Sequence, residues 1–268
     1  MKRKVFLILL CLVFLGMIGY FGSRLYLQWD EYRQGEQIYE ELVQYIDLET
    51  APAEEPTQQK EKNQTTPEQI QDTTEPTSAP DNTVWPAVDF AALQKINPDV
   101  VAWIYVEGTN INYPVVRGSD NSYYLNHLVD GTYNSAGSIF MDYRNERDLT
   151  DRNTILYGHH MQNNSMFNQI TNYKSQEFYD QHPTCLLMTP DGNYKIVLIA
   201  GYVTDMNSDA WKIQFESDEE FSLWLDNAVS RSTFISATEP AAQDRVVTFS
   251  TCTYEYNDAR YVLVGILK

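Results

Sequence analysis

The apolar residues nearest the N-terminus form one continuous run instead of an amphipathic pattern. Residues 5–22 are a stretch of about 18 uncharged, mostly apolar residues, the length that the hydrocarbon core of a bilayer requires. Three basic residues at positions 2–4 precede this run and Arg24 follows it, so the N-terminus is expected on the cytoplasmic side. A cleaved signal peptide is the alternative, but its apolar core is usually shorter and ends at a clear cleavage site. We therefore expect residues 1–24 to form a cytoplasmic tip and a retained single-pass transmembrane helix.

The hydrophobic pattern changes after this run. Apolar side chains at Ile38, Leu42, Val43 and Ile46 recur every three or four residues, which predicts a helix over 25–46 that serves as a stalk or packs on a folded domain. Residues 47–84 contain repeated prolines among Glu, Gln and Thr and almost no large apolar residues. Because such a segment cannot bury enough apolar surface to fold, we expect a disordered spacer that lets a tethered domain reach substrates away from the bilayer.

Residues 85–268 have the pattern of a folded domain. Short runs rich in Tyr, Val, Ile and Phe alternate with Gly, Asn, Asp and Pro, which is typical of a β-barrel or β-sandwich. Two helices interrupt this pattern, one over 90–96 and one over 218–231. In the second, an acidic first turn is followed by four apolar residues on one face, Phe221, Trp224, Leu225 and Ala228. The predicted strands are 100–106, 138–142, 154–157, 184–189, 194–203, 245–251 and 261–267.

Composition narrows the possible partners and the cysteine chemistry. The formal net charge of −18 argues against nucleic acid as a partner, because phosphate binding depends on Lys and Arg. Three cysteines are present, and Cys11 lies in the apolar run, from which it cannot easily reach the other two. A disulfide framework is therefore not expected, and Cys185 is interpreted as a small buried hydrophobe. An unpaired thiol in an exported domain is a candidate reactive group.

Cys252 ends a β-branched strand and is followed by a polar stretch over 253–258. A sheet holds the backbone at such a position while the sulfur faces a groove, as nucleophilic catalysis requires. Arg260 opens the next strand and can return beside Cys252 across a hairpin, where a guanidinium lowers the pKa of a thiol and stabilises an oxyanion. A surface salt bridge with Asp258 or Glu255 is the alternative role for this arginine.

The candidate base lies where another β run ends at a glycine. Gly158 allows a sharp exit from the strand, so that His159 can project over the same face as Cys252. Neighbouring residues of an extended chain point to opposite sides, so only one of His159 and His160 can be the base. Metal binding by this pair is not expected, because the geometry is wrong and no third ligand has credible spacing.

These residues resemble the sortase family, and class B within it. Residues 248–252, Thr-Phe-Ser-Thr-Cys, resemble the family's T-L-x-T-C motif, and 157–159, Tyr-Gly-His, resemble its histidine motif. Arg260 stands where the family's arginine follows the cysteine. Further stretches, among them 137–145, Gly-Ser-Ile-Phe-Met-Asp-Tyr-Arg-Asn, are similar to class B members, and the likeness covers the chain from about residue 95 to the end.

The resemblance implies a mostly β fold, a closed eight-stranded barrel with an N-terminal helix and a helix between strands six and seven that matches 218–231. It implies that the Cys252 thiolate attacks the amide after threonine in a C-terminal sorting signal, of N-P-x-T-x or S-P-x-T-x type, to give a thioacyl enzyme. His159 would protonate the departing amine, and Arg260 would orient the substrate and hold the oxyanion. The implied amine acceptor is a peptidoglycan precursor or a pilin lysine, and no cofactor is required.

The resemblance also implies a substrate groove. The matching positions are Asn121, Leu125, Tyr157, Ser250 and Thr251, with Trp211 in the loop before the covering helix. Phe249 replaces the family's usual leucine, which is a packing change if the ring faces the core and alters the recognised signal if it faces the groove. Thr253 stands where some class B enzymes carry an acidic residue.

The alternatives to a sortase are another exported cysteine enzyme, namely a peptidase or an L,D-transpeptidase, and a binding module without catalysis. Papain-like peptidases place the cysteine before the histidine, opposite to this chain, and the S-x-G-C-x-R motif of L,D-transpeptidases is missing. A tethered binding module without catalysis, such as an inactive sortase-like domain, stays open. A buried Cys252 in such a module would not react with a thiol probe, whereas a catalytic thiolate would.

Overall fold

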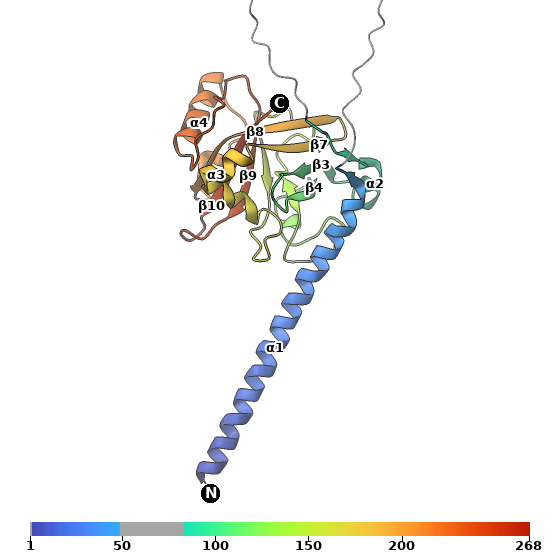
Figure 1. The fold of residues 1–268 in the computed structure, drawn as a ribbon, viewed down its shortest axis with the longest axis vertical. Coiled ribbons are helices and arrows are strands. Elements are labelled where there is room, and N and C mark those ends of the chain that lie inside the picture. Colours follow the sequence, from blue (N-terminus) through green and yellow to red (C-terminus); the bar gives the residue numbers. More distant parts are fainter. Residues whose placement is uncertain (1, 49–82) are drawn as a thin grey trace, which may run out of the picture.

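The structure, a computed structural model, describes residues 2–48 and 83–268. Most of the predicted spacer, 49–82, lies outside the described residues. One long helix, α1 (Lys2–Leu42), projects from a barrel-shaped domain (Figure 1). The predicted transmembrane helix and the predicted stalk are therefore one continuous helix. Its N-terminal part is exposed, and it is long and apolar enough to cross a membrane, a test that a signal sequence also passes.

The C-terminal end of α1 packs on the barrel. Tyr39 is buried, and its hydroxyl donates to the carbonyl oxygen of Gly137 at 2.7 Å. Asn134 Nδ2 donates to the carbonyl oxygen of Glu31 at 2.8 Å, so the contact extends over more than two turns of the helix. Leu42 is buried at the same surface. The helix is thus attached to the domain as well as projecting from it.

Two short strands bring the chain back to its own exit point. After the 3₁₀ turn η1 (Val43–Tyr45), β1 (Ile46–Asp47) pairs with β2 (Ala87–Val88), with Ile46 opposite Val88. Residues 49–82 therefore connect two strands that pair with each other, on a barrel that already contacts α1. The segment thus leaves and rejoins the domain at one place, and its expected role as a spacer that lets the domain reach substrates away from the bilayer stays a prediction.

The domain is a closed eight-stranded barrel, as expected. The strand order around it is β10-β8-β7-β3-β4-β5-β6-β9. The pairs β4–β5 and β6–β9 are parallel and the other neighbours are antiparallel. The strands are β3 (Val100–Tyr105), β4 (Asn112–Val116), β5 (Ile139–Met141), β6 (Asn153–Tyr157), β7 (Thr184–Thr189), β8 (Gly192–Thr204), β9 (Val246–Cys252) and β10 (Arg260–Leu267).

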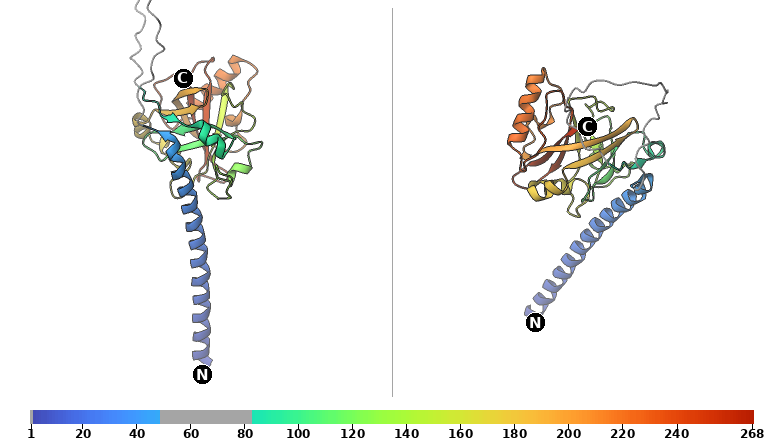
Figure 2. Two further views of the ribbon diagram at one scale, coloured as in Figure 1. Left: turned by 90° about the vertical axis from the view of Figure 1, so that its right-hand side faces the viewer. Right: turned by 45° about the horizontal axis from the view of Figure 1, so that its top comes forward.

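Helix α4 (Asp218–Ser230) covers the outside of the barrel and lies between its sixth and seventh strands, as expected. The Ser217 hydroxyl caps it by accepting from the Glu220 amide at 3.2 Å. Its buried residues are the four that the sequence pattern predicts, Phe221, Trp224, Leu225 and Ala228, and they cluster with residues of β8 and with alternate residues of β10. Figures 1 and 2 show α1 leaving the barrel on the side away from α4.

Strand β4 and several short helical segments were not predicted from the sequence pattern. Strand β4 contains Pro114, which cannot donate to a ladder, so the segment did not have the pattern of a strand. Pro114 is tolerated because it pairs only with Trp103 of β3, and the β5 ladder begins one residue later. The 3₁₀ turn η2 (Tyr123–Leu125) precedes β5, and the 3₁₀ helix η3 (Asn168–Lys174) and α3 (Gln176–Gln181) follow β6, whereas α2 (Phe90–Ile96) has the predicted bounds.

Candidate active site

Cys252 is the last residue of β9 and is partly exposed. Its strand is held on both sides, by β10 and by β6. The neighbouring hydroxyl of Thr251 is buried and donates to the carbonyl oxygen of Gly158 at 2.8 Å. The backbone that carries the thiol is therefore rigid while the sulfur remains accessible.

His159 reaches the same edge of the barrel because β6 and β9 are parallel. Tyr157 is paired with Ser250, and the amide of Gly158 donates to the carbonyl oxygen of Ser250 at 3.1 Å. A residue larger than glycine would not fit at this position. A Cβ at position 158 would lie 2.5 Å from Ile139 Cδ1 and 2.7 Å from the Phe167 ring. Close packing against β5 and Phe167 thus explains why position 158 is glycine, whereas the sequence had suggested a sharp exit from the strand.

The hydrogen bond of His159 identifies which ring nitrogen carries the proton. Nε2 lies 2.6 Å from the carbonyl oxygen of Leu125. A carbonyl oxygen only accepts, so the proton of the neutral ring is on Nε2 and Nδ1 is the basic nitrogen. The loop that carries Leu125 therefore orients the imidazole.

His160 faces a different environment from His159. Its Nδ1 is buried without a hydrogen-bond partner among the described residues, and its ring makes an edge contact with Tyr254 at a centroid distance of 5.2 Å. Burial lowers the pKa of His160, opposed in part by a hydrogen bond with the backbone of Cys252. The two histidines therefore point to different places, and only His159 lines the cavity described below.

Arg260 makes no ion pair with a carboxylate of the described chain. Its Nη2 lies 3.1 Å from Met206 Sδ, and Nη1 donates to the carbonyl oxygen of Ala259 at 3.1 Å. Glu255, one of the two carboxylates weighed as a partner, pairs with Lys174 instead. The guanidinium is therefore available to a ligand, and the salt-bridge alternative is wrong.

These groups line one cavity of about 310 Å³ at the edge of the barrel where β6 and β9 end. Every residue that the sequence assigned to the site contributes to its wall. The sequence did not indicate Phe140 of β5 or Met206, which follows β8 and reaches the cavity because Thr204 pairs with Arg260. The wall consists of Asn121, Leu125, Phe140, Tyr157, Gly158, His159, Met206, Trp211, Ser250, Thr251, Cys252 and Arg260.

The remaining cysteines and the described acidic and histidine side chains offer no second reactive centre of this kind. Cys185 is buried, as expected, and burial raises the pKa of its thiol to about 12. Cys11 lies in the apolar part of α1. Within 2–48 and 83–268, no group of three or more His, Cys, Asp or Glu side chains is arranged to hold a metal ion.

Phe249 faces the core. It is 1% exposed, and its ring packs edge-on against Phe167 at a centroid distance of 5.8 Å. Of the two interpretations of the substitution at the usual leucine position, the packing change is therefore correct.

The chain is similar to known proteins over the barrel domain. A model of the sortase domain matches residues 104–268. A Staphylococcus aureus protein named sortase B is 36% identical over 179 residues, which cover 67% of this chain and 73% of that protein. A solved Staphylococcus aureus sortase B–substrate complex has a TM-score of 0.64 at 36% identity, covering 67% of this chain and 84% of that chain. A solved sortase B complexed with triglycine also has a TM-score of 0.64 at 36% identity, covering 67% of this chain and 85% of that chain. This chain belongs to the sortase family, within it to sortase B, and is a cysteine transpeptidase of that family.

Proposed function

We propose that this protein is a membrane-anchored enzyme that works outside the cell, cleaves a C-terminal sorting signal after threonine and transfers the freed protein to an amine. The observation that carries this proposal is the meeting of Cys252, His159 and Arg260 in the wall of one cavity. A thiol, a base and a guanidinium without a carboxylate partner can supply the nucleophile, the proton transfer and the oxyanion binding of acyl transfer through a thioester.

In the first half of the reaction, the Cys252 thiolate attacks the carbonyl carbon of the threonine residue in the signal. The new C–S bond forms as the carbonyl electrons move to oxygen, where the Arg260 guanidinium stabilises the negative charge. The C–N bond then breaks, and protonated His159 donates the proton of Nδ1 to the departing amine. The products are a thioacyl enzyme and a shortened carboxyl-terminal peptide.

In the second half, an acceptor amine attacks the thioester. His159 takes a proton from the attacking nitrogen at Nδ1, while Nε2 keeps its bond to the Leu125 carbonyl. The C–S bond breaks, an amide forms and Cys252 returns to the thiolate. Neither half needs a redox cofactor, because the acyl group is exchanged without a change in oxidation state.

The cavity wall suits an extended peptide with both apolar and polar side chains. Leu125, Tyr157 and Trp211 supply apolar surface, and Asn121 and Ser250 supply polar groups. The solved Staphylococcus aureus sortase B–substrate complex supports a substrate-binding role for this groove. We propose that the signal is an N-P-x-T-x or S-P-x-T-x pentapeptide. We also propose that Thr251 of the enzyme contacts this peptide.

The solved relative complexed with triglycine supports a primary amine as the acceptor. We propose a glycine-containing peptidoglycan precursor as the first candidate and a pilin lysine as the second. Both can present an unprotonated primary amine, which loses a proton to His159 as it attacks the thioester.

We propose that α1 is retained as a single-pass anchor with its N-terminus in the cytoplasm. Its apolar part follows a basic flank, and its other end is fixed to the barrel through Tyr39 and Asn134. Intact mass measurement of the membrane-extracted protein tests this: a chain that begins near residue 25 would show that the segment is a cleaved signal peptide.

The enzyme activity is tested with the full chain in detergent, incubated with pentapeptides of both signal types, with and without triglycine. Mass spectrometry of the intact protein follows the adduct. We expect an acyl adduct on Cys252 that disappears when triglycine is added, and no adduct on Cys252→Ala of unchanged melting temperature. A folded wild-type protein whose Cys252 reacts with neither peptides nor iodoacetamide would support the non-catalytic module instead.

A further inference from the structure

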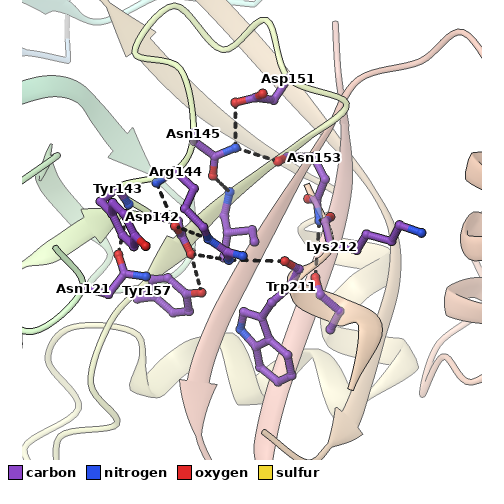
Figure 3. Close-up of polar contacts among 12 residues, drawn as sticks. Asn121, Asp142, Tyr143, Arg144, Asn145, Asp151, Asn153, Tyr157, Trp211 and Lys212 are labelled. Carbon is purple, nitrogen blue, oxygen red and sulfur yellow. Dashed lines mark hydrogen bonds and ion pairs between the residues drawn. The ribbon is translucent and has the colours of Figure 1, made fainter. Parts of the chain in front are cut away.

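An ion pair between a buried carboxylate and a half-exposed arginine lies directly behind the wall of the substrate cavity. Asp142, the residue after β5, has a fully buried side chain. Its carboxylate accepts from Arg144 Nε at 2.9 Å and Nη2 at 2.8 Å, from the Arg144 amide at 3.0 Å and from the Tyr157 hydroxyl at 2.9 Å (Figure 3). Neither Asp142 nor Arg144 lines the cavity. A buried carboxylate is costly unless it is paired and hydrogen-bonded, and the groups that satisfy Asp142 are Arg144 and a residue of the cavity wall.

The first wall residue that this pair holds is Tyr157. Its hydroxyl donates to Asp142 Oδ2, and its ring packs against Phe140 at a centroid distance of 5.2 Å. Burial raises the pKa of Tyr157, and the Asp142 carboxylate raises it further, so the phenol stays protonated and remains a donor. Because the hydroxyl is occupied behind the wall, Tyr157 presents its ring to the cavity in one orientation.

The second wall residue is Trp211, at the end of the 3₁₀ turn η4 (Asp209–Trp211) between β8 and α4. Arg144 Nη2 donates to its carbonyl oxygen at 3.3 Å while it also binds Asp142. Asn153 of β6 donates to the next carbonyl oxygen, that of Lys212, at 2.9 Å. The Trp211 segment is thus attached to the barrel through its backbone, and Arg144 is the link to the Tyr157 wall.

The third wall residue is Asn121, which is held by the residue between Asp142 and Arg144. The Tyr143 amide donates to Asn121 Oδ1 at 3.0 Å, so the side-chain amide has a defined orientation. Within the described part of the chain, Asn121 Nδ2 makes no hydrogen bond of its own and is available as a donor. One three-residue turn therefore contacts residues from three separate parts of the cavity wall.

We propose that the Asp142–Arg144 pair positions the walls of the signal-binding groove, so that it determines how well the peptide binds without taking part in the chemistry. Asp142 and Arg144 are positioning residues that act through Tyr157 and Trp211. Losing the pair lets the Trp211 segment and the Tyr157 ring move independently, which weakens binding of an extended peptide that touches both. Cys252, His159 and Arg260 make no hydrogen bond or ion pair with Asp142 or Arg144, so the reactivity of the thiol is expected to be unaffected.

Arg144→Met tests the proposal, and Arg147→Met is its matched control. Both arginine side chains are about half exposed, at 46% and 47%, and both pair with an aspartate and donate to backbone carbonyls. Arg147 pairs with Asp99 and contacts no residue of the cavity wall. We expect Arg144→Met to raise KM for the signal peptide by about 10-fold with kcat within about twofold, and Arg147→Met to leave both unchanged.

Two further measurements make the test independent of the peptide chosen. Hydrogen exchange of the full chain in detergent should be faster at 209–212 in Arg144→Met and unchanged there in Arg147→Met. Alkylation of Cys252 by iodoacetamide, read by mass spectrometry, should proceed at the wild-type rate in both variants.

The inference rests on the proposed function, and its failure can be told apart from a failure of that function. A wild-type protein that acylates no peptide overturns the proposed function, while the exchange comparison still tests whether Arg144 holds the Trp211 segment. Unchanged exchange at 209–212 in Arg144→Met overturns the inference, and so does an equal rise in KM in the two variants. A parallel loss of Cys252 alkylation in Arg144→Met also contradicts it, because the pair would then act on the nucleophile.

Discussion

Arg260 lies directly opposite Cys252 in the antiparallel ladder between β9 and β10. The backbone of the nucleophile and the backbone of the candidate oxyanion-binding residue are thereby attached to each other across one pair of strands. The same arginine faces Thr204 of β8 on its other side. The sequence of the loop over 253–259 can therefore change without moving the backbone positions that carry the thiol and the guanidinium.

The guanidinium of Arg260 is expected to act through its shape as well as its charge. Arg260→Lys keeps the charge but loses the planar fork, so kcat/KM should fall by about 100-fold, the loss typical of removing one oxyanion donor. Arg245→Lys is the control, because Arg245 lies at the other end of β9 and donates to the Leu149 carbonyl. Steady-state kinetics with the signal peptide measures both, and equal activity of Arg260→Lys and wild type would remove Arg260 from the reaction.

The two adjacent histidines are expected to differ sharply in their effect on the rate. His159→Ala should lower kcat by at least about 100-fold, because it removes the group that transfers the proton. His160→Ala should lower kcat by less than about 10-fold, since its ring packs against Tyr254 outside the cavity. Melting temperatures of both variants separate a loss of catalysis from a loss of folding. The reverse order of activities would assign the base to His160.

Phe249 is expected to affect stability and not the choice of signal. Phe249→Leu leaves space beside Phe167 in the core and should reduce the free energy of unfolding by roughly 1 kcal/mol. The ratio of kcat/KM between N-P-x-T-x and S-P-x-T-x peptides should remain that of the wild type. Denaturant unfolding and competition between the two peptides measure these effects. A changed peptide ratio at unchanged stability would place the ring in the groove.

Asp142 is expected to make stability dependent on pH in the acid range. Burial alone raises its pKa, but the hydrogen bonds from Arg144 and Tyr157 outweigh burial, so the folded pKa lies below the ordinary value of 3.8. A carboxyl whose pKa is lowered on folding contributes stability that is fully present above its unfolded pKa and is lost as pH falls towards the folded value. Asp142→Asn should therefore show a smaller fall in melting temperature than wild type between about pH 5 and pH 3.

The matched control for this pH series is Asp226→Asn, at an exposed position of α4. It should follow the wild-type curve. Identical acid dependence in wild type and Asp142→Asn would show that the pair at Asp142 does not contribute to acid unfolding.

Removing residues 49–82 is expected to leave the catalytic domain intact. The strands on either side, β1 and β2, pair with each other, and α1 contacts the barrel independently of this segment. Replacement by a short Gly/Ser linker should change neither the melting temperature nor kcat/KM for a free pentapeptide. A fall of several degrees in melting temperature would show that these residues support the fold. A control with the same linker and Tyr39→Phe should melt lower, because it loses the bond to Gly137.

Local patterns in the sequence determined much of this protein. Alternating apolar residues and β-branched side chains predicted every barrel strand except β4, and the pattern over 218–231 predicted each residue of the apolar face of α4. Both predictions succeeded because they depend only on side-chain periodicity along a short segment. The cysteine, histidine and arginine motifs lie at strand ends, where their chain neighbours already indicate that they are accessible, and all three residues are partly exposed. Strand β4 was not predicted because Pro114 breaks the local pattern of a strand. The neighbouring strands β3 and β5 nevertheless accommodate the proline.

Only the tertiary structure decided how these pieces meet. The parallel pairing of β6 with β9 brings His159 to Cys252, and the pairing of β8 with β10 brings Met206 to Arg260, across separations that no local pattern records. The docking of α1 through Tyr39 and the attachment of Trp211 through Arg144 likewise join distant segments. Side-chain periodicity states which face of an element is buried, but it does not state against which other element. That choice comes from the closure of the barrel, in which every strand must find two partners.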